Sequence, residues 1–211
     1  MVQPAPPAGR RERNKQAKLD RIIAAAGQLF AEHGVDEVTT QQVAEAADIA
    51  TGTLFLYART KTELLLLVQN AHYRDALEEG LRESASCSDP ATAVMALLTP
   101  IIRCNRVQYE NGRVYLREIA FGDTTAPHHT EAVAIVEETQ HALAETLVRT
   151  ISVDPETAAV MASLVTGAQL LALAGAAESD SDDDVAQNLR RAVEVLVATP
   201  KPKVRTTRAR G

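Results

Sequence analysis

The feature that most constrains this chain is a short polar segment, DIATGTLFLYARTK at residues 48–61, which lies between two much better helices. Before it, apolar residues recur at helical spacing over residues 19–30. A second apolar face follows Thr39 and Thr40, either of which suits the N-cap of its helix. After the segment, Thr60 begins another helix with a capping-box glutamate three residues later. This order predicts a helix-turn-helix unit with a supporting helix on each side.

Individual residues of the segment suit a tight turn followed by a short helix. Such a turn often needs one residue at positive φ, which Asp48 tolerates less well than glycine but better than most residues. Ile49 is the lone apolar residue of the turn, so we expect it to point into a small core. Thr51 and Thr53 lie at a helix N-terminus, where free N–H groups can also meet a phosphate. Gly52 would allow this helix to approach DNA closely.

The rest of the chain is rich in alanine and leucine and shows no pattern typical of strands. Apolar residues make up 45% of the sequence, which is enough for a packed core. The expected further helices are 60–84, 90–110, 112–122, 128–150, 155–176 and 182–198. Pro90 and Pro155 suit the first turn of a helix, whereas Pro100 is expected to kink or split its helix. The sequence therefore predicts an all-α fold.

Charge is distributed unevenly along the chain, whose net charge is −6. Residues 1–63 hold eight basic and eight acidic residues. Residues 64–199 hold nine basic and twenty acidic residues, and residues 200–211 hold five basic residues. The overall acidity therefore does not exclude nucleic acid as a partner of the N-terminal part. We find no apolar run that suggests a membrane span or a signal peptide, and we expect a cytoplasmic protein.

The stretch TTQQVAEAADIATGTLFLYARTKTELL, residues 39–65, resembles the DNA-binding module of the TetR family of bacterial transcriptional regulators. The positions in register with the family pattern are Gly34, Thr39, Thr40, Val43, Ala44, Ile49, Gly52, Thr53, Leu54, Tyr57, Lys61, Glu63 and Leu64. The resemblance is specific over residues 15–65 and extends over the remaining chain by architecture alone. It implies an N-terminal helix-turn-helix three-helix domain and a larger helical-bundle domain that binds a ligand and dimerises.

The resemblance also implies which side chains meet a double-stranded DNA operator. Thr40 matches a phosphate contact, and Gln41 matches a position that reads a base edge. Tyr57 and Lys61 match phosphate contacts, and Lys61 lies at the start of the helix that follows the recognition helix. The residues that match the face of the recognition helix turned to the major groove are Thr51, Gly52, Thr53 and Phe55.

Three positions depart from the family pattern. Asp48 replaces the usual turn glycine. Phe55 stands where tyrosine is common and lacks its hydroxyl. Ala58 stands where phenylalanine is usual, which removes an aromatic anchor between the DNA-binding domain and the next helix.

Simpler roles exist for several of these residues. Thr40 and Thr60 suit plain helix caps, Tyr57 suits an aromatic at the edge of a core, and Lys61 suits a solvated charge. The arginines at residues 10–13 have two interpretations: a basic arm that enters a minor groove, or an unstructured arm that only aids solubility.

The last two helices carry the expected dimer interface. Helix 155–176 is apolar nearly all round and must be buried, and helix 182–198 has one apolar face. In the family such a pair packs against its twin in a homodimer; the alternative is that both complete the core of one monomer. Helices 60–150 are expected to enclose a pocket for a small, largely apolar effector. The candidate ligand contacts are Asn70, Met95, Leu98, Arg103, Asn105, Tyr109, Arg117, Phe121, His128 and Thr139.

An enzymatic alternative rests on one Glu-x-x-His spacing, Glu138 to His141, which occurs in pairs in helical di-iron proteins. A second such motif is missing, so the sequence predicts no catalytic residue, no metal and no cofactor.

The sequence thus predicts four segments: a flexible basic arm at 1–14, a helix-turn-helix domain at 15–63, an effector-binding and dimerisation domain at 64–199 and a disordered basic tail at 200–211. The predicted function is a repressor released from its operator by the effector. The alternative is a regulator without such a ligand, controlled by a protein partner or acting as an activator.

Overall fold

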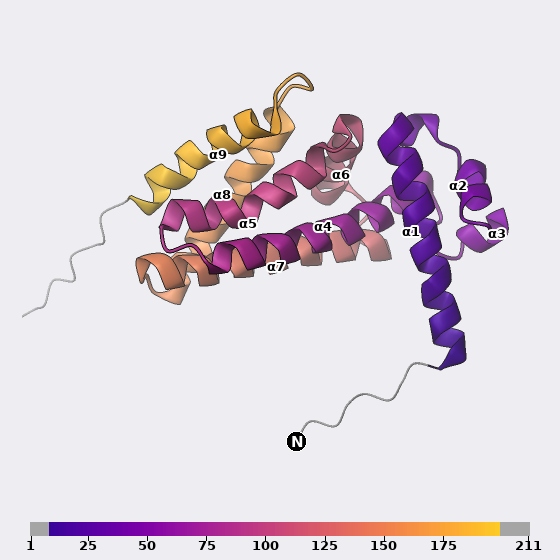
Figure 1. Ribbon diagram of the computed structural model, residues 1–211, viewed down its shortest axis with the longest axis horizontal. Helices are drawn as coiled ribbons and strands as arrows, with labels where there is room; N and C mark the ends of the chain where they lie inside the picture. The colour runs from indigo at the N-terminus through magenta and orange to yellow at the C-terminus, as the bar shows by residue number, and fades with distance from the viewer. Residues whose placement is uncertain (1–8, 199–211) are drawn as a thin grey trace, which may run out of the picture.

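The computed structural model describes residues 9–198 (Figure 1), so the predicted tail at 200–211 and most of the predicted arm at 1–14 lie outside the described residues. Within this range the chain is helical and without strands. The helices are α1 (Arg10–Glu37), α2 (Thr40–Ala46), α3 (Thr51–Leu54), α4 (Lys61–Ala85), α5 (Pro90–Arg106), α6 (Tyr109–Phe121), α7 (Pro127–Ile151), α8 (Pro155–Gly175) and α9 (Asp182–Val197). The all-α prediction is confirmed.

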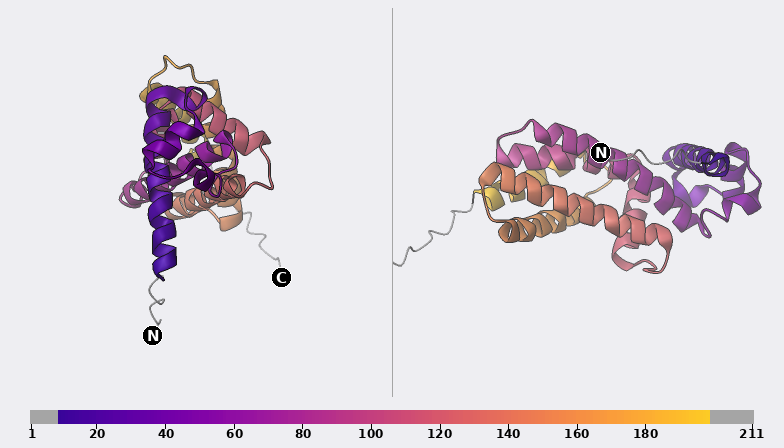
Figure 2. Two further views of the ribbon diagram at one scale, coloured as in Figure 1. Left: turned by 90° about the vertical axis from the view of Figure 1, so that its right-hand side faces the viewer. Right: turned by 90° about the horizontal axis from the view of Figure 1, so that it is seen from below.

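The molecule has two parts, as Figures 1 and 2 show from three sides. Helices α1 to α3 form a small domain at one end, and α4 to α9 form an elongated bundle. Helix α1 runs across the end of the bundle and projects beyond α2 and α3. It begins at Arg10, five residues before the expected start at Lys15, and Gly34 interrupts it at φ 75°. The charged residues 10–14 showed no apolar periodicity, which is why the sequence did not predict their helix.

Local capping signals predicted the starts of α2 and α4. The Thr39 side chain accepts a hydrogen bond from the Gln42 amide in a reciprocal capping box. Thr60 caps α4 in the same way, but the Glu63 carboxylate reaches back to the amide of Arg59 instead of Thr60. Asp48 has φ 52°, so the turn before α3 does use a residue at positive φ.

Helix α4 belongs to both parts of the molecule. Its first turns contribute Leu64 and Leu65 to the core of the small domain, together with Phe30 and Leu54. Leu66, on another face, joins the core of the bundle. The run of apolar residues at the start of α4 is therefore explained by two cores that lie on different sides of one helix.

The bundle departs from the sequence predictions at two helices. Pro100 lies inside α5 but does not split it. Helix α8 buries one side only, and Val160, Leu164 and Leu171 remain 59%, 58% and 77% exposed. By length and composition α8 could cross a membrane, contrary to the expectation that no such run exists, although this test is also passed by core helices.

Candidate functional site

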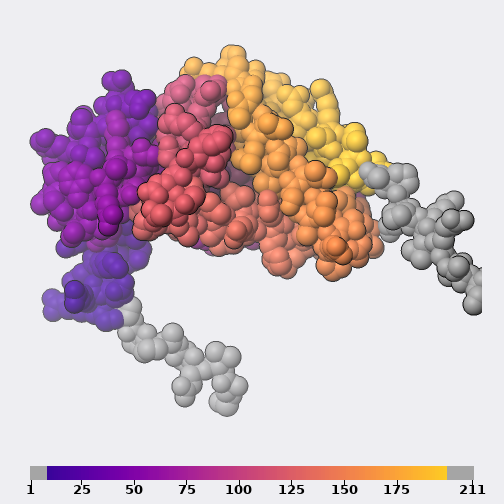
Figure 3. Space-filling model, turned by 180° about the vertical axis from the view of Figure 1, so that it is seen from behind, coloured from indigo at the N-terminus to yellow at the C-terminus, as the bar shows by residue number. Residues whose placement is uncertain are grey.

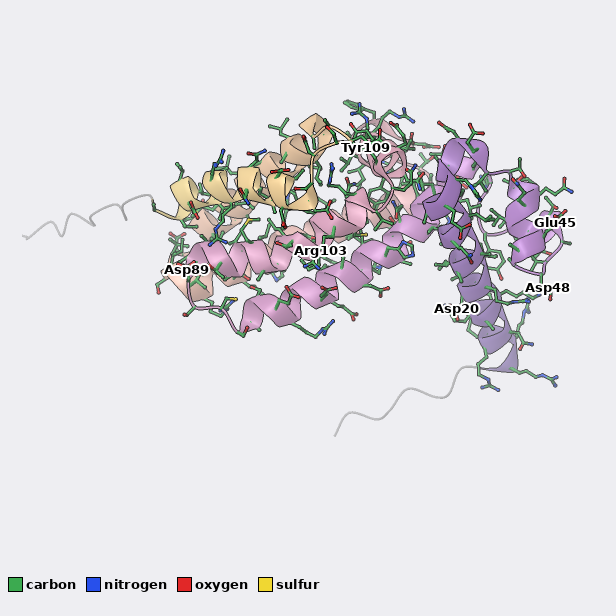
Figure 4. All side chains as sticks on the ribbon, turned by 45° about the horizontal axis from the view of Figure 1, so that its top comes forward. Asp20, Glu45, Asp48, Asp89, Arg103 and Tyr109 are labelled. Atoms are coloured by element: carbon green, nitrogen blue, oxygen red, sulfur yellow. The ribbon has the colours of Figure 1, made fainter. Side chains whose placement is uncertain are left out.

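The helix-turn-helix unit lies at the outer end of the small domain, where Figure 4 labels Asp48 in the turn between α2 and α3. A carboxylate oxygen of Asp48 lies 3.3 Å from a guanidinium nitrogen of Arg21 on α1, which links the turn to the supporting helix. Leu54 is fully buried and fastens α3 to the core, while Ile49 packs partly buried against it. These contacts therefore fasten α3, a helix of only four residues, to the rest of the small domain.

The side chains expected to meet a DNA groove lie on the open side of this unit. Gln41, Gly52 and Phe55 are exposed, and Thr51 and Thr53 are half-buried. A side chain placed at Gly52 would meet nothing within 4 Å, so packing does not require glycine here. Its value lies in the close approach that it allows to a partner outside the chain. Thr40, in the first turn of α2, is half-buried beside them.

The two expected phosphate contacts are partly engaged within the protein. The Tyr57 hydroxyl donates to the carbonyl of Lys15 at 3.4 Å, and the Lys61 ammonium donates to the carbonyl of Asp36 at 2.9 Å. An ammonium has three donors, so Lys61 retains two for another acceptor. Both residues also tie α1 to the chain that follows the helix-turn-helix unit.

A basic groove of about 720 Å³ lies between the N-terminal turns of α1 and the segment around α3. The cations Arg10, Arg11, Lys15 and Lys18 line it. Thr53, Leu56 and Tyr57 form part of its opposite wall. Arg10, Arg11 and Arg13 thus belong to a helix that lies beside the recognition segment. The charge row could have been found in the sequence, but its neighbour across the groove could not.

Two hollows lie between α6 and α8 in the bundle. The inner cavity, of about 40 Å³, is lined almost entirely by apolar and aromatic side chains from α4 to α8, among them Tyr73 and Tyr115. The two rings are stacked with centroids 4.6 Å apart. Burial raises the pKa of both phenols well above the ordinary value, so they stay neutral.

The outer groove, of about 570 Å³, opens on the face drawn in Figure 3, where α6 and α8 border one another. Arg113, Arg117 and Glu110 of α6 and apolar residues of both helices line it, so the two cations outnumber the one carboxylate. Leu116 and Leu170 line the inner cavity as well, so the two hollows adjoin.

Of the expected ligand contacts, Thr139 lines the inner cavity, and Arg117 and Phe121 line the outer groove. Residues that line neither hollow are Asn70, Met95, Leu98, Arg103, Asn105, Tyr109 and His128. Met95 and Leu98 pack in the core, and Arg103 is exposed on α5 (Figure 4). The side chains of Asn70, Asn105, Tyr109 and His128 form hydrogen bonds inside the protein: Asn105 donates to the Tyr73 hydroxyl, for example. Helical spacing alone does not say which neighbour each face will meet.

A hydrogen-bonded chain leads from the inner cavity to the helix-turn-helix unit. The Tyr115 hydroxyl donates to the side-chain oxygen of Asn70 at 2.9 Å. The Asn70 amide donates to the carbonyl of His128 at 2.9 Å, and Nε2 of His128 donates to the carbonyl of Tyr57 at 2.7 Å. Ala58 follows Tyr57 directly and is 3% exposed. The hydrogen bond from His128 to the Tyr57 carbonyl therefore lies next to Ala58, the position where the family pattern has an aromatic residue.

A second connection joins α6 to α1. The buried Asn111 side chain accepts from the amide of Val35 at 2.7 Å and donates to the carbonyl of Phe30 at 2.8 Å. These two residues flank the interruption of α1 at Gly34. The wall of the outer groove is thus linked directly to the supporting helix of the small domain.

The residues of the metalloenzyme alternative are engaged elsewhere. Glu138 forms an ion pair with Arg74 at 3.1 Å, and His141 lies 3.3 Å from Glu145. Within residues 9–198, no group of three or more His, Cys, Asp or Glu side chains is arranged to hold a metal ion.

Residues 40–55 have the geometry of a helix-turn-helix unit, and the helices that follow form a larger helical bundle. Residues 22–68 match the family described as bacterial regulatory proteins, tetR family. The match covers the helix-turn-helix unit and parts of its flanking helices, so this N-terminal part of the chain is a DNA-binding module of the TetR type.

Among curated relatives, the fatty acid metabolism regulator protein of Bacillus subtilis (strain 168) is 26% identical over 87 residues, which cover 40% of this chain and 45% of that protein. The chain thus matches less than half the length of this relative.

Solved structures share the fold over most of the chain. FadR of Thermus thermophilus in complex with lauroyl-CoA covers 92% of this chain and 99% of its own, with 22% identity and a TM-score of 0.66. A TetR regulator from Rhodococcus sp. RHA1 has 19% identity and a TM-score of 0.67, and the match covers 89% of this chain and 100% of that one. FadR of Bacillus subtilis in complex with stearoyl-CoA has 16% identity and a TM-score of 0.61, with 86% and 99% covered.

Proposed function

We propose that this protein is a one-component transcriptional repressor that binds a DNA operator through α2, α3 and the flanking residues. One observation carries the proposal: the exposed face of residues 51–55 follows a tight turn and lies beside a groove lined by four cations and a single carboxylate, Glu12. A short polar helix with exposed Gly52 and Phe55 suits a major groove. The cations of α1 suit the phosphates beside it. Such a regulator acts in the cytoplasm, where the chromosome lies.

The active form in this proposal is a homodimer through α8 and α9. The exposed apolar side of α8 supports it, because contiguous apolar surface on a protein usually marks an interface. A two-fold pair also doubles the DNA sequence that two short recognition helices can read. The alternative in which both helices only complete the core of one monomer leaves this apolar side in water.

The proposed effector is amphipathic, with an apolar chain for the inner cavity and an anionic head for the outer groove. Arg113 and Arg117 supply positive charge at the groove, and the cavity behind it is apolar. An acyl thioester of coenzyme A has this chemistry, and two proteins of the same fold bind lauroyl-CoA and stearoyl-CoA. The head group adds charge to the largely apolar effector that the sequence suggested.

Ligand entry would move α6 in this mechanism. The inner cavity of about 40 Å³ holds roughly one water molecule. An acyl chain therefore enters only if α6 and α8 separate. Asn111 links α6 to α1, and Tyr115 links it through Asn70 and His128 to Tyr57. A conformer with α6 displaced would bind the effector better and the operator worse, which is the difference in affinity that release requires.

The nearly closed cavity also favours the second candidate, a regulator without a small-molecule effector. A thermal-shift screen with acyl-CoA thioesters of increasing length separates the two. A rise in melting temperature for any of them supports the effector, and no shift with intact operator binding supports the second candidate.

The DNA assignment is tested with operator fragments recovered genome-wide by the wild-type protein. Tyr57→Ala combined with Lys61→Ala should weaken binding to all fragments and flatten its dependence on salt, because phosphate contacts are lost. Arg103→Ala, an exposed arginine of the bundle, is the matched control. Unchanged operator affinity in the double variant would show that the assigned docking is wrong.

A further inference from the structure

The inner cavity contains one polar side chain without a partner. Gln169 of α8 is 5% exposed and lines the cavity. Among residues 9–198 its amide has no hydrogen-bond partner. In the same range no fully enclosed side-chain nitrogen or oxygen lacks a partner, so the Gln169 amide borders open space, and the cavity that this residue lines is such a space.

The other polar groups of the cavity wall already donate or accept. The Tyr73 hydroxyl accepts from Asn105, and the Tyr115 hydroxyl donates to Asn70. The hydroxyls of Thr139 and Thr166 donate to carbonyls one turn earlier in their own helices. Gln169 is therefore the wall side chain that lacks any partner among residues 9–198, and its amide N–H groups remain for a ligand. The Tyr73 hydroxyl accepts from Asn105, so its own O–H is a second donor that a ligand oxygen could use.

The charge of the wall limits what such a ligand can present. No Lys, Arg or His side chain lines the cavity, whereas Arg113 and Arg117 line the adjoining groove. A charged group inside would lose its hydration without gaining a counter-ion. The ligand group beside Gln169 is thus a neutral acceptor.

We infer that Gln169 is a binding residue that donates a hydrogen bond to a neutral oxygen in the buried part of the effector. This inference rests on the proposed acyl thioester effector. Two sources supply the same chemistry: the thioester carbonyl, or a hydroxyl on the acyl chain. In both cases the cavity prefers the ligand that carries the oxygen, because its absence leaves a buried amide unpaired.

The experiment measures, by isothermal titration calorimetry, the affinity of the full-length protein for two pairs of compounds. Dodecanoyl-CoA is compared with S-dodecyl-CoA, which lacks the carbonyl, and 3-hydroxydodecanoyl-CoA is compared with dodecanoyl-CoA. The wild-type protein should prefer the oxygen-bearing member of at least one pair by about tenfold, the effect of one hydrogen bond. The pair that shows the preference identifies the source.

Gln169→Met keeps the side-chain length but removes the amide. The two members of each pair should therefore bind this variant with about equal affinity. Gln140→Met, a half-buried glutamine of α7 that does not line the cavity, should retain the preference of the wild-type protein. Thermal unfolding of both variants checks that the fold is kept. An unchanged preference in Gln169→Met would overturn the inference and leave the acyl effector standing. Binding of none of the compounds would overturn the proposed effector and the inference with it.

Discussion

The two ends of this molecule differ in how far the chain satisfies its own groups. In the small domain most apolar residues form one core, with Phe55 and Leu56 exposed beside the turn, and Asp48, Thr39 and Lys61 all have partners within the chain. In the bundle, α8 exposes apolar side chains and Gln169 lacks a hydrogen-bond partner among the described residues. We interpret the small domain as a DNA-binding domain whose own contacts hold it together. In our interpretation the bundle leaves groups for other molecules: a second copy of the chain would cover the apolar side of α8, and an effector would bind behind α6.

The largest expected effect comes from a substitution that disrupts the proposed homodimer interface on α8. Leu164→Glu places a charge in the middle of the exposed apolar side of α8, where a dimer would have to bury it. We expect the mass measured by light scattering to fall from that of a dimer to that of a monomer, with loss of operator binding. Val107→Glu, which replaces an exposed apolar residue outside α8 and α9, should keep the dimer. A Leu164→Glu protein that stays dimeric would place the interface elsewhere.

A smaller effect tests whether the two ends are firmly joined. Asn111→Ala leaves the Val35 amide and the Phe30 carbonyl without their partner in a buried place. We expect the free energy of unfolding in urea to fall by about 2–3 kcal/mol. The exposed Asn14→Ala on α1 should change it little. An equally small loss for Asn111→Ala would mean that this connection carries no coupling.

The smallest expected effect concerns the missing aromatic anchor. Ala58 is 3% exposed, so Ala58→Phe should overpack the joint and lower the free energy of unfolding by about 1–2 kcal/mol. Ala24→Phe, at an exposed position of α1, serves as the control. A stabilised Ala58→Phe protein would show that the joint has room for the family aromatic and that the His128 bond does not replace it.

The same contrast explains what the sequence could predict. Asp48, Thr39 and Thr60 were identified because turns and caps depend on residues a few positions apart. Most helix bounds of the bundle followed from proline and aspartate signals of the same local kind. The exception is the break between α5 and α6, expected near residue 111 but found at residues 107–108, where no such signal stands. The ligand contacts did not follow, since Asn70 and His128 acquire their partners from helices far away in sequence. In the sequence nothing distinguishes Gln169 from the other polar residues of α8, and only its neighbours in the fold reveal that it lacks a partner.

The most direct test of the account is the operator affinity of the wild-type protein with and without dodecanoyl-CoA, measured by fluorescence anisotropy at constant salt. We predict that a saturating concentration of the thioester weakens operator binding by tenfold or more, about 1.4 kcal/mol of coupling. Free coenzyme A, which lacks the acyl chain, should have little effect. Operator affinity that the thioester leaves unchanged, although calorimetry shows that it binds, would contradict the proposed link between the two ends.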